Sequence, residues 1–379
     1  MLERTQFKRD EEKNIFINFE SLEEKKESLD DFVSNEPLLN KSKFSKTDFP
    51  QEIKFNDAIE GIDDDVSDIE KVLSRSFMPV NRDKTRIMNL YKGYKYILQH
   101  KDINKDNLRE LYGILSNDLL KREDSKRMGK YYRNAPVYIL RGNRLDRYFN
   151  GVDVDHIDEY MNILFDYINN NDDKTDIDTF IKSQIIHCYC VYIHPYFDVN
   201  GRTSRTLAMW YLFNKKDLSY MTFNRSISFM KSKYEKSLIE LREKGNMTPF
   251  LDYMLDAERL ELEKEYIINN IEKNIGNKLT NEEYLTLEYL LSLNGRLTLL
   301  DLINMYNDFN SKKKKHIVLQ DEINPLIEKE IIKPTFDTKH HIVDGIKNKR
   351  IILNGDMLDI DTKKIKLLRL DHYIKESQD

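Results

Sequence analysis

His194-Pro195-Tyr196-Phe197-Asp198-Val199-Asn200-Gly201-Arg202-Thr203-Ser204-Arg205 is the stretch around which the chain is organised. The segments on either side of it, residues 180–193 and 206–213, are apolar over helical lengths, which predicts two buried helices. Pro195 cannot continue the first helix, because proline lacks a backbone N–H. The stretch is therefore predicted to be a loop that joins two buried helices and ends at the N-terminus of the second.

Such a loop suits a polyphosphate, because the N-terminus of a helix presents free N–H groups and positive charge. Gly201 allows the backbone to approach a ligand closely, and Arg202 and Arg205 offer forked donors from one helix face. Asp198 is a hard oxygen ligand for magnesium, and His194 can accept a proton near neutral pH. Together these residues indicate phosphoryl or nucleotidyl transfer to a hydroxyl, with His194 as the base.

A structural explanation exists for any two of these residues taken alone. Arginines that follow a glycine are often a solvated helix start, and a single aspartate is often an N-cap. The functional interpretation is favoured because six such residues fall within twelve positions, between two buried helices.

The stretch resembles the signature of the Fic family, His-Pro-Phe-x-Asp/Glu-Gly-Asn-Gly-Arg-x-x-Arg, and the resemblance extends over residues 50–260. Most Fic proteins transfer AMP from ATP to a Ser, Thr or Tyr hydroxyl of a protein. The resemblance implies a mainly α-helical bundle with a β-hairpin flap, bound ATP and Mg2+, His194 as the catalytic base and Asp198 as the metal ligand. The residues that it places at the nucleotide and its phosphates are Val199, Asn200, Gly201, Arg202, Arg205 and Tyr234.

Two residues depart from the family signature. Tyr196 replaces phenylalanine, so the ring is expected to pack as usual while its hydroxyl reaches water. Val199 replaces the first glycine. If this position needs a positive φ, a β-branched residue is strained there by about 1–3 kcal/mol. Such strain would alter the fine shape of the phosphate site, and with it the rate or the nucleotide preference.

Residues 55–62 predict a short helix that Asn56 or Asp57 caps, with apolar residues at i, i+4 and i+7. On its residues alone, this is a surface helix with a solvated Glu60. It is also similar to the inhibitory helix of some Fic proteins, Ser/Thr-x-x-x-Glu-Gly/Asn, in which Asn56 stands where Ser or Thr is usual. The resemblance implies that Glu60 pairs with Arg205 and displaces the γ-phosphate of ATP.

Residues 129–142 are rich in β-formers and bounded by glycines, which predicts a hairpin that turns at residues 134–136. The exposed edge of such a hairpin can pair with a strand of a partner, although an ordinary surface turn is the alternative. In Fic proteins this position is the flap that holds the target segment beside the histidine. The flap residues expected to bind the target are Tyr132, Arg133, Val137, Tyr138 and Ile139.

The remaining pattern divides the chain into three predicted domains. Residues 1–84 are an N-terminal arm with the inhibitory helix, 85–260 the catalytic core, and 261–379 a connector helix with a C-terminal domain. The core is expected to hold helices at 84–99, 104–121, 154–170, 176–193 and 226–256. Residues 280–354 resemble a winged helix-turn-helix, a frequent companion of Fic cores. Four lysines at 312–315 could meet DNA phosphates, but a solvated helix start explains them as well.

The composition is that of a globular protein. The chain has 379 residues, 34% of them charged, and a net charge of −5, which excludes general nucleic-acid binding by the whole molecule. Cys188 and Cys190 are too close on one helix to form a disulfide, and with His187 and His194 they lack the spacing of a zinc site. Without a signal peptide or an apolar run of membrane length, we expect a cytoplasmic protein.

Several functional alternatives remain open on the sequence. The same fold could remove AMP from a protein, transfer UMP or transfer phosphate. A DNA-binding regulator with a vestigial Fic core is a further alternative, although the intact His194 argues against it. The protein target could include this chain itself, and a homodimer is one option for the oligomeric state.

Overall fold

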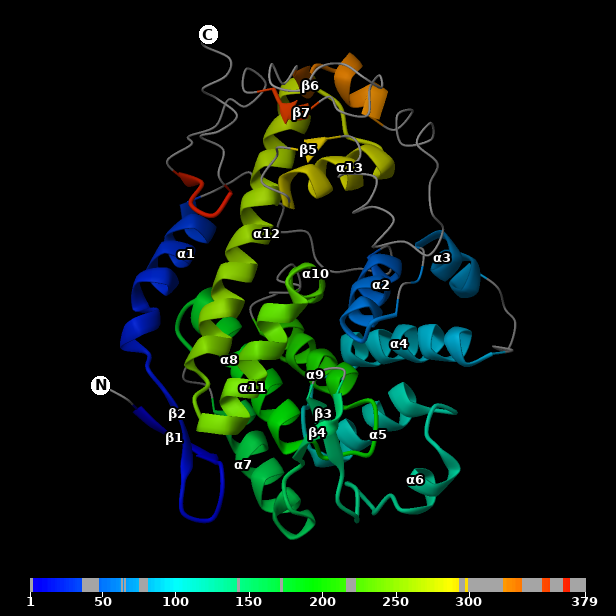
Figure 1. The fold of residues 1–379 in the computed structure, drawn as a ribbon, viewed down its shortest axis with the longest axis vertical. Coiled ribbons are helices and arrows are strands. Elements are labelled where there is room, and N and C mark those ends of the chain that lie inside the picture. The colour runs from blue at the N-terminus through cyan, green and yellow to red at the C-terminus, as the bar shows by residue number, and fades with distance from the viewer. Residues whose placement is uncertain are drawn as a thin grey trace. The chain divides into compact units, whose positions relative to one another are not determined.

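A computed structural model describes residues 3–35, 48–62, 64, 66–74, 81–141, 144–170, 173–215, 223–292, 297–298, 323–335, 350–354 and 364–368. The chain forms two compact units (Figure 1). The first comprises Met1–Asp30, Ser42–Ile62 and Val66–Ala257, and the second comprises Asp31–Lys41, Asp63–Asp65 and Glu258–Asp379. In the described part of the chain, no helix is both long enough and apolar enough to cross a bilayer.

Two helices form the centre of the first unit. Helix α8 (Asp176–Ile193) packs along α9 (Asn200–Asn214), and both are buried over most of their lengths. Thr175 and Asp178 start α8 with a reciprocal capping box, in which each side chain accepts the backbone N–H of the other residue. The prediction of a buried helix at 176–193 is confirmed, as is that of a helix beginning at Asn200.

Other helices surround this pair. They are α2 (Phe49–Ile59), α3 (Val66–Ser74), α4 (Arg82–Gln99), α5 (Lys105–Ser116), α6 (Arg122–Lys126), α7 (Ile157–Asn169), α10 (Asn224–Phe229), α11 (Lys231–Lys244) and the part of α12 (Thr248–Ile275) up to Ala257, with a short 3-10 helix η2 (Val154–His156). Helices α4 and α5 pack against each other and against α9, while α2 packs on α10 and α4. The helix predicted at 104–121 ends at Ser116, because Asp118 adopts a left-handed conformation, φ 55°. The predicted run 226–256 is divided among α10, α11 and α12.

The N-terminal arm is more ordered than the sequence suggests. Strands β1 (Glu3–Lys8) and β2 (Asn14–Ile17) form an antiparallel hairpin, followed by η1 (Glu20–Leu22) and α1 (Glu23–Asn35). The Tyr192 hydroxyl donates to the Arg9 carbonyl at 2.7 Å, and Phe16 exchanges backbone bonds with Gly245 and Met247. The hairpin therefore fastens the start of the chain to α8 and to the segment before α12.

The flap prediction is wrong in its position. The hairpin consists of β3 (Tyr138–Arg141) and β4 (Arg144–Asn150), which follow the predicted turn at 134–136 rather than flank it. Residues 128–135 form an irregular loop instead, with one bridge between Met128 and Arg133. Pro136 lacks the N–H that a ladder needs, so regular pairing begins after it.

The prediction for α2 is also corrected. The helix begins at Phe49 with Pro50 in its first turn, so Asn56 and Asp57 lie inside the helix and are buried rather than capping it. Glu60 follows the last helical residue, and Gly61 after it adopts φ 80°, which favours glycine.

The second unit holds the remaining elements. Helix α13 (Asn281–Ser292) starts with a capping box between Thr280 and Glu283, as its sequence predicts. Strands β5 (Leu297–Thr298), β7 (Arg350–Leu353) and β6 (Ile332–Thr335) follow in that order in an antiparallel sheet. Most of residues 293–349, including the lysines at 312–315, lie outside the described residues, so the winged helix stays a prediction.

Candidate functional site

His194 ends α8 in a left-handed conformation, with φ 55° and ψ 59°. This backbone conformation is unusual for a residue other than glycine, and neighbouring groups hold it in place. The His194 N–H donates to the Cys190 carbonyl at 3.1 Å, and its own carbonyl accepts from Arg133 Nε at 2.9 Å. Within the described residues, His194 Nδ1 has no hydrogen-bond partner, so the imidazole remains available for chemistry.

The surroundings of His194 keep its imidazole neutral. Burial, together with the guanidinium groups of Arg242 and Arg133, lowers the pKa of His194 to about 3, although a hydrogen bond to the Val191 backbone and the charge of Glu60 act in the opposite direction. The side chain is therefore unprotonated at physiological pH. A neutral imidazole can accept a proton, although a lowered pKa also makes it a weaker base.

Asn200 holds the loop between the two helices. Its Nδ2 donates to the Tyr196 carbonyl at 2.9 Å, and its Oδ1 accepts from the Tyr196 N–H at 3.0 Å. The amide predicted to contact a phosphate is therefore engaged by the loop itself. This fixes the loop geometry, and contact between Asn200 and a nucleotide stays a prediction.

Tyr196 is fully buried, so the expectation that its hydroxyl reaches water is wrong. Its ring stacks on that of Tyr112 from α5, with the centroids 3.6 Å apart and the planes 7° apart. In the described part of the chain, neither hydroxyl has a hydrogen-bond partner. The catalytic loop is thus held against α5 by the faces of two aromatic rings.

Val199 has a positive φ of 64°, the case in which a β-branched residue is strained, and it precedes the first residue of α9. Its N–H donates to Asp198 Oδ1 at 2.7 Å, and Asp198 itself is exposed. Among the described residues, no three His, Cys, Asp or Glu side chains converge as a metal site.

The first two turns of α9 carry Gly201, Arg202 and Arg205, which together form the candidate anion site. Arg205 is 1% exposed, while the guanidinium of Arg202 has two buried nitrogens, Nε and Nη1, without partners in the described chain. Two arginines at a helix N-terminus provide strong attraction for a negatively charged group.

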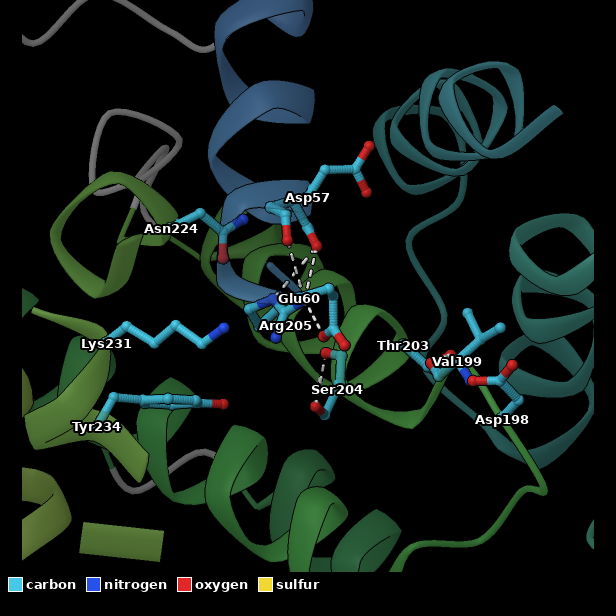
Figure 2. Close-up of polar contacts among 12 residues, drawn as sticks. Asp57, Glu60, Asp198, Val199, Thr203, Ser204, Arg205, Asn224, Lys231 and Tyr234 are labelled. Atoms are coloured by element: carbon cyan, nitrogen blue, oxygen red, sulfur yellow. Dashed lines mark hydrogen bonds and ion pairs between the residues drawn. The ribbon is translucent and has the colours of Figure 1, made fainter. Parts of the chain in front are cut away.

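Glu60 occupies this anion site (Figure 2). Its Oε1 accepts from Arg205 Nη2 at 2.7 Å, and a Cβ added to Gly201 would lie 2.5 Å from the same oxygen. The carboxylate therefore lies against the backbone at the start of α9, where only glycine leaves room for it. Although burial acts to raise it, Arg205 and Arg202 hold the pKa of Glu60 below its usual value.

Two further contacts position Glu60. Asn56 Oδ1 accepts from Arg205 Nη2 at 2.8 Å and from its Nε at 3.2 Å, and Asn56 Nδ2 donates to the Tyr94 hydroxyl at 3.0 Å. Asp57 Oδ2 accepts from Arg86 Nε at 2.9 Å, in a buried ion pair that ties α2 to α4. Asn56, which lies one helical turn before Glu60, thus accepts hydrogen bonds from the same arginine, Arg205.

Tyr234 of α11 is buried close to this cluster. Its hydroxyl lies 3.1 Å from His187 Nε2, which places it in the core under the anion site (Figure 2). The expected contact with the adenosine part of a nucleotide stays a prediction.

The residues predicted to bind a target divide into two groups. Tyr132 and Arg133 are buried and precede the hairpin, so their side chains do not face a partner. Tyr138 is 66% exposed at the start of β3, between the partly exposed Val137 and Ile139. Only these three remain candidates for a target-binding edge.

Some residues of the site were missed by sequence reasoning. These residues are Arg86, Arg242 and Tyr94, which lie on amphipathic helices. Single polar residues on such helices usually face solvent, so a single sequence does not indicate that these three are buried near the site. One sequence feature could have indicated the non-helical backbone of His194. It is followed by Pro195, and a proline disfavours the α-helical conformation in the residue before it.

The fold and the site define a helical domain in which two arginines at a helix N-terminus lie on the same loop and helix as a buried, neutral histidine. A sequence model of the Fic/DOC family matches residues 102–212, from the segment before α5 into α9. Residues 102–212 are therefore similar to the Fic/DOC family.

Solved structures share this fold. A Fic family protein from Desulfovibrio desulfuricans G20 is 19% identical, covering 88% of this chain and 96% of that chain, with a TM-score of 0.55. Fic-1 of C. elegans, residues 134–508, is 16% identical over 65% and 71% of the two chains, with a TM-score of 0.48. A Fic-domain signaling protein from Bacteroides thetaiotaomicron VPI-5482 is 17% identical over 65% and 96%, with a TM-score of 0.45. The first similarity, which spans nearly the whole of that protein, confirms the helical Fic fold.

Proposed function

We propose that this protein transfers AMP from ATP to a hydroxyl of a protein, its own chain included, and that Glu60 restrains the reaction. One observation carries the proposal: a carboxylate already lies in the anion site, 2.7 Å from Arg205 and against Gly201. A site that binds this carboxylate beside a neutral histidine suits the phosphates of a nucleotide equally well.

In this proposal ATP binds with its phosphates at the start of α9. The N–H groups of the first turn and the guanidinium groups of Arg202 and Arg205 neutralise the phosphate oxygens. Asp198 would hold Mg2+ together with the phosphates, and the ion would supply further positive charge when bound. Arg202 fits this role because two of its nitrogens are buried without partners in the described chain.

The chemical step is a substitution at the α-phosphorus. The hydroxyl oxygen of the target forms a bond to that phosphorus while the bond to the bridging oxygen of the β-phosphate breaks. Pyrophosphate leaves with the electron pair, and the hydroxyl proton passes to His194, whose lowered pKa keeps it unprotonated beforehand. Catalysis then depends on positioning and fixed charge.

Glu60 restrains this reaction because it competes with a phosphate for Arg205. The ion pair and the Asn56 contacts must be replaced before a triphosphate can lie fully in the anion site. Charge-assisted hydrogen bonds in a partly buried site are strong enough for such competition.

The test uses purified Glu60→Gly protein with Mg2+ and ATP labelled at either the α- or the γ-phosphate. We expect the α-label to appear on protein, faster than with the unaltered chain, and the γ-label not to appear. His194→Ala in the same background should abolish labelling while ATP still binds, because only the base is lost. His156→Ala, a partly exposed histidine outside the site, is the matched control.

Three results would contradict the proposal. Transfer of the γ-label would mean phosphate transfer, and full activity of His194→Ala would remove the base. An unchanged rate for Glu60→Gly would mean that α2 does not regulate the site.

A further inference from the structure

Arg133 lies between the hairpin and the catalytic histidine, and its guanidinium bonds to backbone carbonyls on both. Nε donates to the His194 carbonyl at 2.9 Å, Nη1 to the Ala135 carbonyl at 2.9 Å, and Nη2 to the Val152 carbonyl. The Arg133 N–H also donates to the Pro195 carbonyl at 2.9 Å. Arg133 is 2% exposed, so its side chain bonds to groups inside the protein and not to a partner at the surface.

The three carbonyls belong to three separate segments. Ala135 precedes β3, Val152 follows β4, and His194 ends α8. The base of the hairpin is closed by the Gly151 N–H, which donates to the Val137 carbonyl at 3.1 Å. One planar group thus joins both ends of the hairpin to the residue that carries the imidazole.

Burying this charge is costly, so its retention calls for an explanation. Burial lowers the pKa of Arg133 to about 10, yet the group stays protonated at physiological pH. A guanidinium offers rigid, diverging donors to several acceptors at once, whereas an ammonium group is a point charge. The geometry therefore requires arginine in particular rather than any cation.

We propose that Arg133 is a positioning residue that fixes the spacing between the target-holding hairpin and His194. The inference rests on the proposed function, in which a target hydroxyl bound along the hairpin reaches the His194 imidazole. Misplacement of reacting groups by about 1 Å can cost a hundredfold in rate. Because one side chain bonds to both the hairpin and His194, it keeps the distance between the bound target and the imidazole constant.

The same group acts on the charge of His194. The groups facing the imidazole are Arg133, Arg242 of α11, and Glu60 after α2. Arg242 Nη2 also donates to the Val191 carbonyl at 2.7 Å, near the C-terminus of α8. A helix C-terminus favours a protonated histidine, and the two cations counteract this effect.

The experiment compares Arg133→Lys and Arg133→Met in the Glu60→Gly background, with Arg127→Met as control. Arg127 is an exposed cation six residues earlier in the chain. Three quantities are measured for each variant: the rate of α-label transfer, the affinity for ATP, and the His194 pKa from NMR titration of histidine-labelled protein. The titration needs no activity, and thermal unfolding shows whether each variant is folded.

We expect both Arg133 variants to lose about a hundredfold in transfer rate with ATP affinity unchanged, because the spacing is lost in each. Arg133→Met should also raise the pKa of His194, whereas Arg133→Lys, which keeps the charge, should leave it low. Arg127→Met should resemble the parent in all three measurements.

Full transfer by Arg133→Lys would overturn the positioning role, because a lysine lacks the rigid, diverging donors with which Arg133 holds the three carbonyls at fixed spacing. An unchanged His194 pKa in Arg133→Met would overturn the electrostatic part. If the Glu60→Gly parent transfers no label at all, the proposed function fails instead, and the titration still tests the link between Arg133 and His194.

Discussion

Val199 combines a β-branched side chain with a backbone conformation that suits glycine. It precedes α9 at φ 64° and ψ 15°, and its carbonyl accepts hydrogen bonds from the N–H and the hydroxyl of Thr203. The side chain is almost fully buried, so packing offsets part of the strain. The start of the anion site is therefore held in a strained but anchored conformation.

Two substitutions at this residue separate strain from packing. Val199→Ala and Val199→Gly both remove the side-chain packing, but only glycine relaxes at positive φ. We expect Val199→Gly to be more stable than Val199→Ala by about 1 kcal/mol in urea unfolding. At Val191, inside α8, the order should reverse, with glycine less stable than alanine by about 1 kcal/mol. The same order at both positions would contradict strain at Val199.

At the scale of elements, α2 is held in place by buried polar groups rather than by an apolar face alone. Asp57 pairs with Arg86, and Glu52 accepts a hydrogen bond from Asn224 of α10. Burial raises the pKa of Glu52 to about 7, although Asn224 and nearby arginines act to lower it. The groups that face this carboxyl are Asn224, Arg225, Arg205, Asp48 and Tyr94. The docking of α2 therefore depends on the protonation of Glu52.

The sign of this pH dependence follows from the raised pKa. The unfolded chain ionises Glu52 near pH 4.5, whereas the folded chain keeps the proton until about pH 7. The protonated Glu52 carboxyl contributes its full share to the free energy of unfolding below pH 4.5. This contribution decreases as the pH rises from 4.5 to about 7. We expect the unaltered protein to lose about 1.4 kcal/mol per pH unit relative to Glu52→Gln in this window.

Urea unfolding of both proteins between pH 4 and pH 8 measures this difference. Groups that titrate in both proteins contribute equally to both free energies of unfolding, so their effects cancel in the difference between the two proteins. One such group is Glu60, whose lowered pKa makes its contribution to stability increase, rather than decrease, as the pH rises. A difference that does not change with pH would show that Glu52 titrates normally. Because Glu52 holds α2, AMP transfer by the unaltered chain should rise over the same window relative to Glu52→Gln.

At the scale of the whole molecule, the proposed binding of nucleotide would be linked to folding. The chain has a net charge of −5, yet Arg202, Arg205 and Lys231 all lower the pKa of Glu60, against the effect of its burial. Figure 2 shows Lys231 and Tyr234 extending toward the ion pair from α11. The single negative charge of Glu60 therefore lies near three positive charges. A polyphosphate, which carries several negative charges, would neutralise them more fully than Glu60 does.

This linkage predicts a difference in thermal stability. ATP with Mg2+ at a hundred times its dissociation constant should stabilise Glu60→Gly by about 2.7 kcal/mol, seen as a higher Tm. The unaltered chain should gain less at the same concentration, because ATP must first displace Glu60. Glu60→Gly with Arg205→Met should gain less too, because a phosphate ligand is missing. Equal gains for all three proteins would place the nucleotide elsewhere.

The sequence by itself determined the central helices, the loop between them and the chemistry of that loop. Apolar periodicity specifies α8, and Pro195 with Gly201 specifies where the chain turns, because these signals are local. The pairing of Glu60 with Arg205 was also expected, since the resemblance to Fic proteins names both positions, whereas a positive φ at Val199 was only considered as a condition.

The tertiary structure alone decided how the site is held. The burial of Asn56 and Asp57, the stacking of Tyr196 on Tyr112, and the three carbonyls around Arg133 join segments far apart in the chain. Whether a polar side chain is solvated or buried depends on what packs over it, and a helix pattern does not carry that information. For the same reason the hairpin was misplaced: strand pairing depends on backbone partners beyond the turn, whereas helical hydrogen bonds close within four residues.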